Sequence, residues 1–256
     1  MAIFTARCLR RSSPSITDPY VITAHSLALL LAFISIFSRL SCLFLFFSLI
    51  LPFFDKKDVG KRQAKYLAGN KSEPVLQTLR EDRAAMHAAL RVITETFTAY
   101  AIACMEQGAS GIFYATNGWA SESMLTADQY REFGEQYDLE FLDAIKSRSK
   151  FNILHNCGTH IYFDQIAAYP VQAVNWDVAA EGNPDLGTGK MRSGKAVMGG
   201  INQKTTLKNG TPEQVREEVA RAIELTGGTH FLLAPGCSIP PETPARNLEA
   251  IRRALS

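Results

Sequence analysis

Five short apolar runs, separated by longer amphipathic segments, recur between residue 111 and the C-terminus. Runs of this length that are apolar on both faces are typical of buried parallel strands. Two parallel strands need a crossover connection, usually a helix, so a chain that alternates strands with helices forms an α/β layer or barrel. The expected strands are residues 111–116, 151–155, 171–176, 196–201 and 230–234.

The segments around these strands have helical patterns. Apolar residues recur at helical intervals before Gly108, which is placed to end a helix. Thr211 and Pro212 form a helix start, with a capping residue followed by proline at the first turn. The expected helices are residues 76–107, 126–147, 161–168, 211–226 and 243–255, and a polar connection is expected after residue 176.

The fold class predicted from this alternation is α/β, of the (β/α)8 TIM-barrel type. A closed barrel has eight strands and typically about 250 residues. The chain has 256 residues, but the pattern starts late and contains five strands. We therefore expect an incomplete barrel of about five C-terminal β/α units, occupying residues 55–256.

Residues 1–54 are expected to form an N-terminal extension. Residues 26–54 are almost wholly apolar, with Arg39 as the one charge, and are long enough to cross a bilayer as a helix. Basic residues on both sides leave the orientation open. The alternatives are a buried hydrophobic segment and a stretch misread from non-coding sequence. The catalytic domain is expected in the cytoplasm, anchored to the membrane if this segment spans it.

Charge and cysteine content argue against two classes of protein, nucleic-acid-binding proteins and proteins held together by disulfides. The formal net charge is +2, and no basic stripe with interleaved aromatic residues appears, so a nucleic-acid partner is not expected. Five scattered cysteines in a chain of this length do not form a disulfide framework. A cysteine with a function in this chain is therefore expected to bind metal or take part in catalysis.

Three side chains of the types that bind metal stand at the ends of expected strands. His155 and Cys157 are two residues apart, so their side chains point the same way, and Cys237 follows another strand. The C-terminal ends of barrel strands meet on one rim. One imidazole and two thiolates suit zinc, and three ligands leave the fourth position open, as in catalytic zinc sites. The spacing also fits a hydrogen-bonded histidine and two buried cysteines.

Other polar side chains on the same rim are candidates for substrate binding or a fourth ligand. Each of the substrate-binding candidates directly follows an expected strand, and Asp177 could alternatively be a solvated carboxylate. Glu122 is a candidate fourth zinc ligand; its alternative is a surface residue before the helix that starts at Thr126. The substrate-binding candidates are Asn117, Asp177 and Asn202.

Several motifs resemble the uroporphyrinogen decarboxylase family. They are NILHNCG, AVMGGINQKTTLKNGTPEQVREEV and APGCSIPPETPARNLEAIRRAL, in family order, and the likeness covers about 180 residues from Pro74 onward. One branch of the family decarboxylates a porphyrinogen. Another moves methyl groups between corrinoid proteins and thiols with zinc held by a His-x-Cys…Cys set, which His155, Cys157 and Cys237 match.

The resemblance implies zinc-dependent methyl transfer from a methyl-corrinoid or similar donor to a small thiol. A corrinoid would come with a partner protein, because no cobalt-ligating histidine motif appears here. Porphyrinogen decarboxylation is the alternative. Against it, the arginine-rich N-terminal loop of decarboxylases is absent or replaced, and Cys237 stands where they have histidine. A third alternative is an inactive, truncated remnant.

Overall fold

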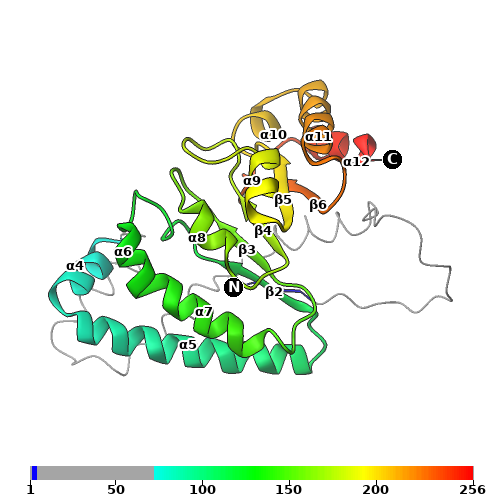
Figure 1. Cartoon of the computed structure of the whole chain (residues 1–256). Coiled ribbons are helices and arrows are strands. Elements are labelled where there is room, and N and C mark those ends of the chain that lie inside the picture. The colour runs from blue at the N-terminus through cyan, green and yellow to red at the C-terminus, as the bar shows by residue number, and fades with distance from the viewer. Residues whose placement is uncertain (1, 5–71, 256) are drawn as a thin grey trace.

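The computed structural model describes residues 2–4 and 72–255, which form one six-stranded sheet with helices. The strands follow one another in sequence order across the sheet (Figure 1). The first strand pairs antiparallel with the second, and the other five are parallel. The strands are β1 (Ala2–Phe4), β2 (Gly111–Ala115), β3 (Ile153–Asn156), β4 (Ala173–Trp176), β5 (Ala196–Ile201) and β6 (Phe231–Pro235).

Helices connect each parallel strand to the next, as in a barrel. The prediction of an α/β fold with five C-terminal β/α units is confirmed, whereas β1 was not expected. The helices are α4 (Glu73–Glu81), α5 (Arg83–Glu106), α6 (Ala127–Tyr130), the π-helical turn η1 (Arg131–Glu135), α7 (Gln136–Ile145), α8 (Phe163–Ala167), α9 (Leu186–Ser193), α10 (Thr206–Asn209), α11 (Pro212–Thr226) and α12 (Ala245–Ala254).

Local sequence explains where several helices begin. Thr126 and Thr211 each form a capping box with the glutamine three residues later. The expected helix over residues 76–107 is two helices, because Asp82 leaves the helical conformation and its side chain accepts a hydrogen bond from the backbone of Ala85. The expected polar connection after β4 contains α9, which Asp185 caps.

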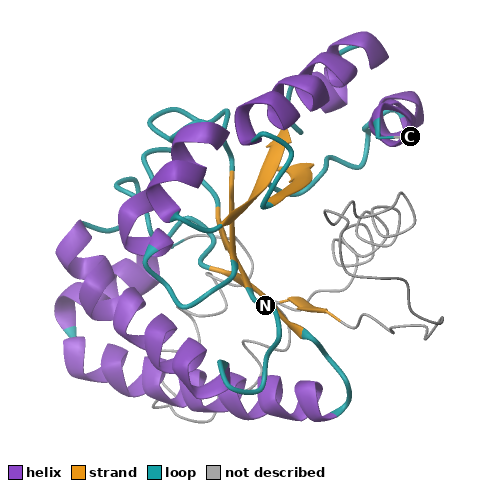
Figure 2. Cartoon of the chain, turned by 45° about the vertical axis from the view of Figure 1, so that its right-hand side comes forward, coloured by secondary structure: helices purple, strands orange, loops and turns teal. Residues whose placement is uncertain are grey.

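The described helices lie on one face of the curved sheet (Figure 2). Side chains alternate between the two faces of a strand. Leu154, Val174 and Val197 face the helices and belong to the largest apolar cluster. Ile153, Ala173 and Met198 belong to a separate cluster on the other face, which in a barrel is the interior.

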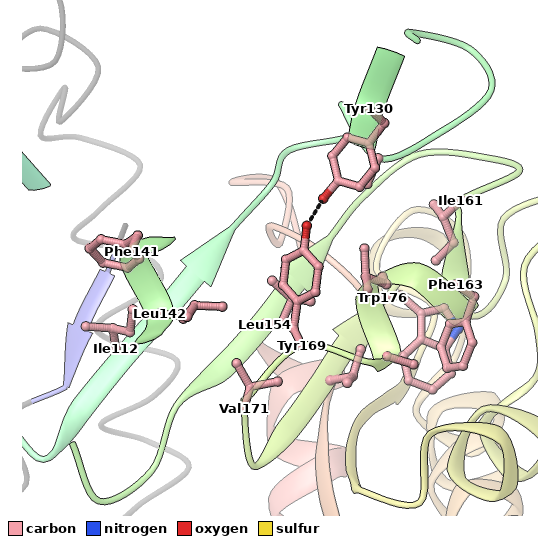
Figure 3. Close-up of a cluster of buried hydrophobic side chains, with 14 of the residues drawn as sticks. Ile112, Tyr130, Phe141, Leu142, Leu154, Ile161, Phe163, Tyr169, Val171 and Trp176 are labelled. Atoms are coloured by element: carbon pink, nitrogen blue, oxygen red, sulfur yellow. Dashed lines mark hydrogen bonds between the residues drawn. The ribbon is translucent and has the colours of Figure 1, made fainter. Parts of the chain in front are cut away.

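A buried carboxylate links this sheet to its helices. Asp138 of α7 accepts hydrogen bonds from Tyr114 of β2, from Tyr130 of α6 and from Tyr169, which precedes β4. The hydroxyls of Tyr130 and Tyr169 also contact each other at 2.6 Å (Figure 3). Burial raises the pKa of Asp138, while the three hydroxyls oppose that shift. The cluster fixes α6 and α7 against strands β2 and β4.

One described helix, α5, is long and apolar enough to cross a membrane by length and composition alone. Of its most apolar 18-residue stretch, 11% is buried. Its partly buried residues Met86, Leu90 and Phe97 pack against the main core. The expected membrane segment, residues 26–54, lies outside the described residues, as does the expected domain boundary near residue 55.

Close packing at Gly189 of α9 gives a test of this fold. A β-carbon built at Gly189 would lie 2.3 Å from the Trp176 indole and 3.2 Å from the Phe163 ring. Alanine favours a helix by about 1 kcal/mol over glycine. We expect the clash to outweigh that gain, so that Gly189→Ala destabilises the chain by about 1–3 kcal/mol in urea unfolding followed by circular dichroism.

The matched control is Met191→Ala on the same helix, since Met191 is 78% exposed. This change should alter the free energy of unfolding by less than about 0.5 kcal/mol. A Gly189→Ala variant as stable as the parent would contradict the packing of α9 against β4.

Candidate metal centre

Three side chains that sequence analysis singled out come together at the carboxyl-end rim of the sheet. The ligand atoms of His155, Cys157 and Cys237 all lie within 4.8 Å of one another. The Nε2 atom of His155 is 3.8 Å from the Cys237 sulfur. His155 is buried and the two cysteines are half-buried. Two soft sulfurs and one imidazole nitrogen at this separation fit a tetrahedral zinc ion with one position left for another ligand.

Parallel pairing brings His155 and Cys157 to the rim. His155 pairs with Asn175 on β4, and Asn175 pairs with Met198 on β5. Cys157 lies one residue beyond the last residue of β3 and two beyond His155, so its side chain points to the same face as the imidazole.

The chain after β6 must pass over part of the sheet to bring Cys237 close to His155 and Cys157. Cys237 follows β6, which is three strands from β3, or about 14 Å at the usual spacing of neighbouring strands. The preceding residue, Gly236, packs against the end of β4: a β-carbon there would lie 2.6 Å from the Asp177 α-carbon. Gly236 therefore lets the chain pass over the end of β5, and the curvature of the sheet supplies the rest of the approach.

A hydrogen-bond network holds this crossing in place. The Gly236 amide donates to the side-chain oxygen of Gln203 at 3.1 Å, and the Gln203 side-chain nitrogen donates to Asp177 at 3.3 Å. Gln203 is 1% exposed. Glu218 of α11 accepts from the Asn202 amide at 3.0 Å and so fixes the loop that carries Gln203.

The two sulfurs share one proton. The Cys157 thiol donates to Cys237, and this bond, together with the contact to His155, lowers the pKa of Cys237 to about 4. The same bond and burial raise the pKa of Cys157 well above its ordinary value. At neutral pH the metal-free centre therefore has a thiolate at Cys237 and a thiol at Cys157.

A carboxylate and an ammonium group stand beside the sulfurs. The Lys204 ammonium lies 2.9 Å from the carboxylate of Asp177, which is buried at the end of β4. The hydrogen bond to Asp177 raises the pKa of Lys204, and the charge of Cys237 acts in the same direction. The pair places an exposed ammonium group beside the Cys237 thiolate, and the Asp177 carboxylate balances its charge.

The other candidate residues lie on the same rim with different surroundings. Asn117 is exposed, in a left-handed turn after β2 with φ 52°. The Asn202 side-chain oxygen accepts from the Lys204 and Thr205 amides, so this residue forms the turn after β5. Glu122 is exposed and lies outside the group of three ligands. Substrate binding by Asn117, Asp177 and Asn202, and metal binding by Glu122, stay predictions.

Sequence analysis missed two buried polar residues that support the centre. One is Gln203, and the other is Asn175, whose side-chain oxygen lies 2.6 Å from Nδ1 of His155. A signal for Asn175 was present: it is a polar residue inside an apolar strand, two residues before Asp177 and therefore on the same face.

Comparison of the sequence with characterised proteins finds methyltransferases and a decarboxylase. The chain is 32% identical to methylcobamide:CoM methyltransferase MtaA of Methanosarcina barkeri over 174 residues. The aligned region covers 64% of this chain and 46% of that protein. It is 29% identical over 152 residues to methylcobamide:CoM methyltransferase MtbA of Methanosarcina acetivorans, covering 59% and 43%. It is 26% identical over 178 residues to uroporphyrinogen decarboxylase of Hydrogenovibrio crunogenus, covering 68% and 48%. The chain spans less than half the length of these relatives.

Solved structures agree on the fold. A methyltransferase from Methanosarcina mazei superposes with a TM-score of 0.63 at 25% identity, over 72% of this chain and 53% of that one. A B12-independent methionine synthase from Shewanella shares the fold, with a TM-score of 0.50 at 14% identity, over 68% and 54%.

Residues 63–256 match the family described as Uroporphyrinogen decarboxylase (URO-D), which is most of the chain. The similarity to the methyltransferases above supports the methyltransferase branch of that family. The chain belongs to the uroporphyrinogen decarboxylase family.

Proposed function

We propose that this protein transfers a methyl group to a thiol, with zinc held by His155, Cys157 and Cys237. The observation that carries the proposal is the meeting of these three ligand atoms within 4.8 Å on the rim of the sheet. The methyltransferase relatives support it, since two of them are named for transfer between a methylcobamide and CoM. A corrinoid protein is the partner that this reaction would require.

Zinc, when bound, would lower the pKa of a coordinating thiol, so that its sulfur reacts as a thiolate at neutral pH. The sulfur–carbon bond forms as the bond between the methyl group and its donor breaks, and the electron pair of that bond stays with the donor. The chain supplies one neutral and two anionic ligands and leaves a position for the substrate. Lys204 also lies beside the sulfurs, where Asp177 balances its charge.

Porphyrinogen decarboxylation, the alternative, finds less support in the described residues. That reaction would need cations on the rim to hold carboxylates. Lys204 is paired with Asp177, and Arg192 is paired with Asp164. Lys190 donates to the carbonyl oxygens of Thr226, the last residue of α11, and of Thr229, three residues beyond it. Of the cations that the sequence offered, these three already have partners.

Zinc content and methyl transfer test the proposal together. We expect the full chain to bind about one zinc per molecule and to transfer methyl groups from methylcobalamin to a thiol. Cys237→Ala removes one of three ligands, so it should lose most of the zinc and reduce transfer to the uncatalysed rate. Elemental analysis gives the metal content, and loss of the methylcobalamin absorbance gives the rate.

The matched control is Cys104→Ala. Cys104 is a half-buried cysteine of α5 outside the ligand group, and its removal should leave zinc content and rate unchanged. A folded parent without zinc, or a Cys237→Ala variant with the parent's zinc content, would contradict the proposal.

The protonation state of the cysteines predicts how zinc affinity changes with pH. Cys237 is already a thiolate at neutral pH, whereas Cys157, with its raised pKa, must lose a proton when it binds the metal. Between about pH 7 and pH 9, the zinc association constant should therefore rise about tenfold per pH unit, with about one proton released per zinc. Chelator competition at several pH values measures the slope.

Cys104→Ala is the control for this slope. The variant keeps both rim sulfurs, so its association constant should rise with pH as steeply as that of the parent. A parent with no pH dependence, or with a hundredfold change per unit, would show that the sulfurs do not share a single proton.

A further inference from the structure

The Asn175 side chain makes three hydrogen bonds that join four strands. It lies in β4, is 2% exposed, and its oxygen is 2.6 Å from Nδ1 of His155 on β3. Its nitrogen donates to the backbone oxygen of Met198 on β5 at 2.8 Å and to that of Pro235 on β6 at 3.3 Å. We infer that Asn175 is a positioning residue that presents the Nε2 atom of His155 to the metal, an inference that rests on the proposed zinc site.

The hydrogen bonds of Asn175 determine which nitrogen of His155 is free. Backbone oxygens accept hydrogen bonds and cannot donate them, so the NH₂ end of the amide faces Met198 and Pro235. The amide oxygen is then left facing Nδ1, where it can only accept, and Nδ1 carries the imidazole proton. In a neutral imidazole the lone pair is then on Nε2, the atom that lies 3.8 Å from the Cys237 sulfur.

The same amide also controls the distance between two of the ligands. Pro235, whose backbone oxygen Asn175 binds, lies two residues before Cys237. His155 and the end of β6 are therefore both held by one rigid side chain on the strand between them. The Phe113 ring stacks on the imidazole, with centroids 5.5 Å apart, and limits its rotation from the other side.

A buried asparagine can also serve stability alone, and Asn152 provides the matched comparison. Asn152 is 1% exposed, directly precedes β3, and bonds to the Ile112 amide and the Ser149 hydroxyl. It lies three residues before His155, at the opposite end of the strand, and makes none of its hydrogen bonds to the metal centre. Replacing either asparagine with leucine removes buried hydrogen bonds. Only the change at Asn175 is expected to alter the orientation of the His155 imidazole.

The test uses the full chain, its Asn175→Leu and Asn152→Leu variants, and zinc alone as the probe. We expect Asn175→Leu to weaken zinc binding about 10- to 100-fold, the effect typical of losing a partner of a histidine ligand. Asn152→Leu should stay within about twofold of the parent, even where it lowers the unfolding midpoint. Chelator competition gives the affinities, and urea unfolding shows the cost in stability of each change.

Nuclear magnetic resonance of the zinc-loaded chain with ¹⁵N-labelled histidine tests the geometry directly. The parent should carry its proton on Nδ1 of His155 and the metal on Nε2. Asn175→Asp should keep the proton on Nδ1, because a carboxylate also accepts from Nδ1, but should lower stability, because its other oxygen cannot donate to the backbone oxygens of Met198 and Pro235. This readout and the parent spectrum remain decisive if Asn175→Leu does not fold.

The outcomes separate this inference from the proposed function. A parent that binds zinc through Nδ1, or an Asn175→Leu variant that binds as tightly as Asn152→Leu, would overturn the role of Asn175 and leave the zinc site intact. A folded parent that binds no zinc would overturn the proposed function and this inference with it.

Discussion

The register of the parallel strands is the constraint on which the rest of this structure depends. Parallel pairing places the carboxyl ends of β3, β4, β5 and β6 on one rim, and the pairing of His155 with Asn175 aligns the polar positions of neighbouring strands. Because side chains on a strand alternate, a slip of one residue would turn His155 from the inner face toward the helices. The candidate centre therefore exists only in this register.

The two faces of the sheet differ in what they contact. The outer face carries large side chains such as Leu154 and Trp176, which pack against the helices and hold the strands in place. The inner face carries Ile153 and Ala173 below the rim, and then His155 and Asn175, with Met198 in the same row as these two polar residues. The apolar layer below the imidazole excludes water, which strengthens the hydrogen bonds that orient it.

Sequence patterns predicted the parts of the site that depend on one strand at a time. Strand alternation placed His155 and Cys157 on one face, and the parallel fold placed Cys237 on the same rim. The approach of Cys237 over the end of β5 could not be predicted, because it depends on a close contact between Gly236 and Asp177, from different strands. The supporting role of Gln203 has the same origin, since it bridges these two elements.

Helix prediction differed from the structure where a local hydrogen bond changed the outcome. Asp82 lies inside a continuous helical pattern, yet its side chain caps the following helix and divides the pattern in two. In α9, two glycines and few apolar residues weakened the helical signal, although Asp185 is a clear capping residue. Packing of Gly189 on Trp176, a contact between elements, explains why a glycine is present inside that helix.

The central claim is that His155, Cys157 and Cys237 together hold a zinc ion, and zinc X-ray absorption of the loaded full chain tests it most directly. The account predicts two sulfur neighbours at about 2.3 Å and one imidazole nitrogen at about 2.0–2.1 Å. A first shell made of oxygen and nitrogen alone would contradict it. That result would mean that zinc binds elsewhere on the chain and that the two cysteines on the rim are not ligands.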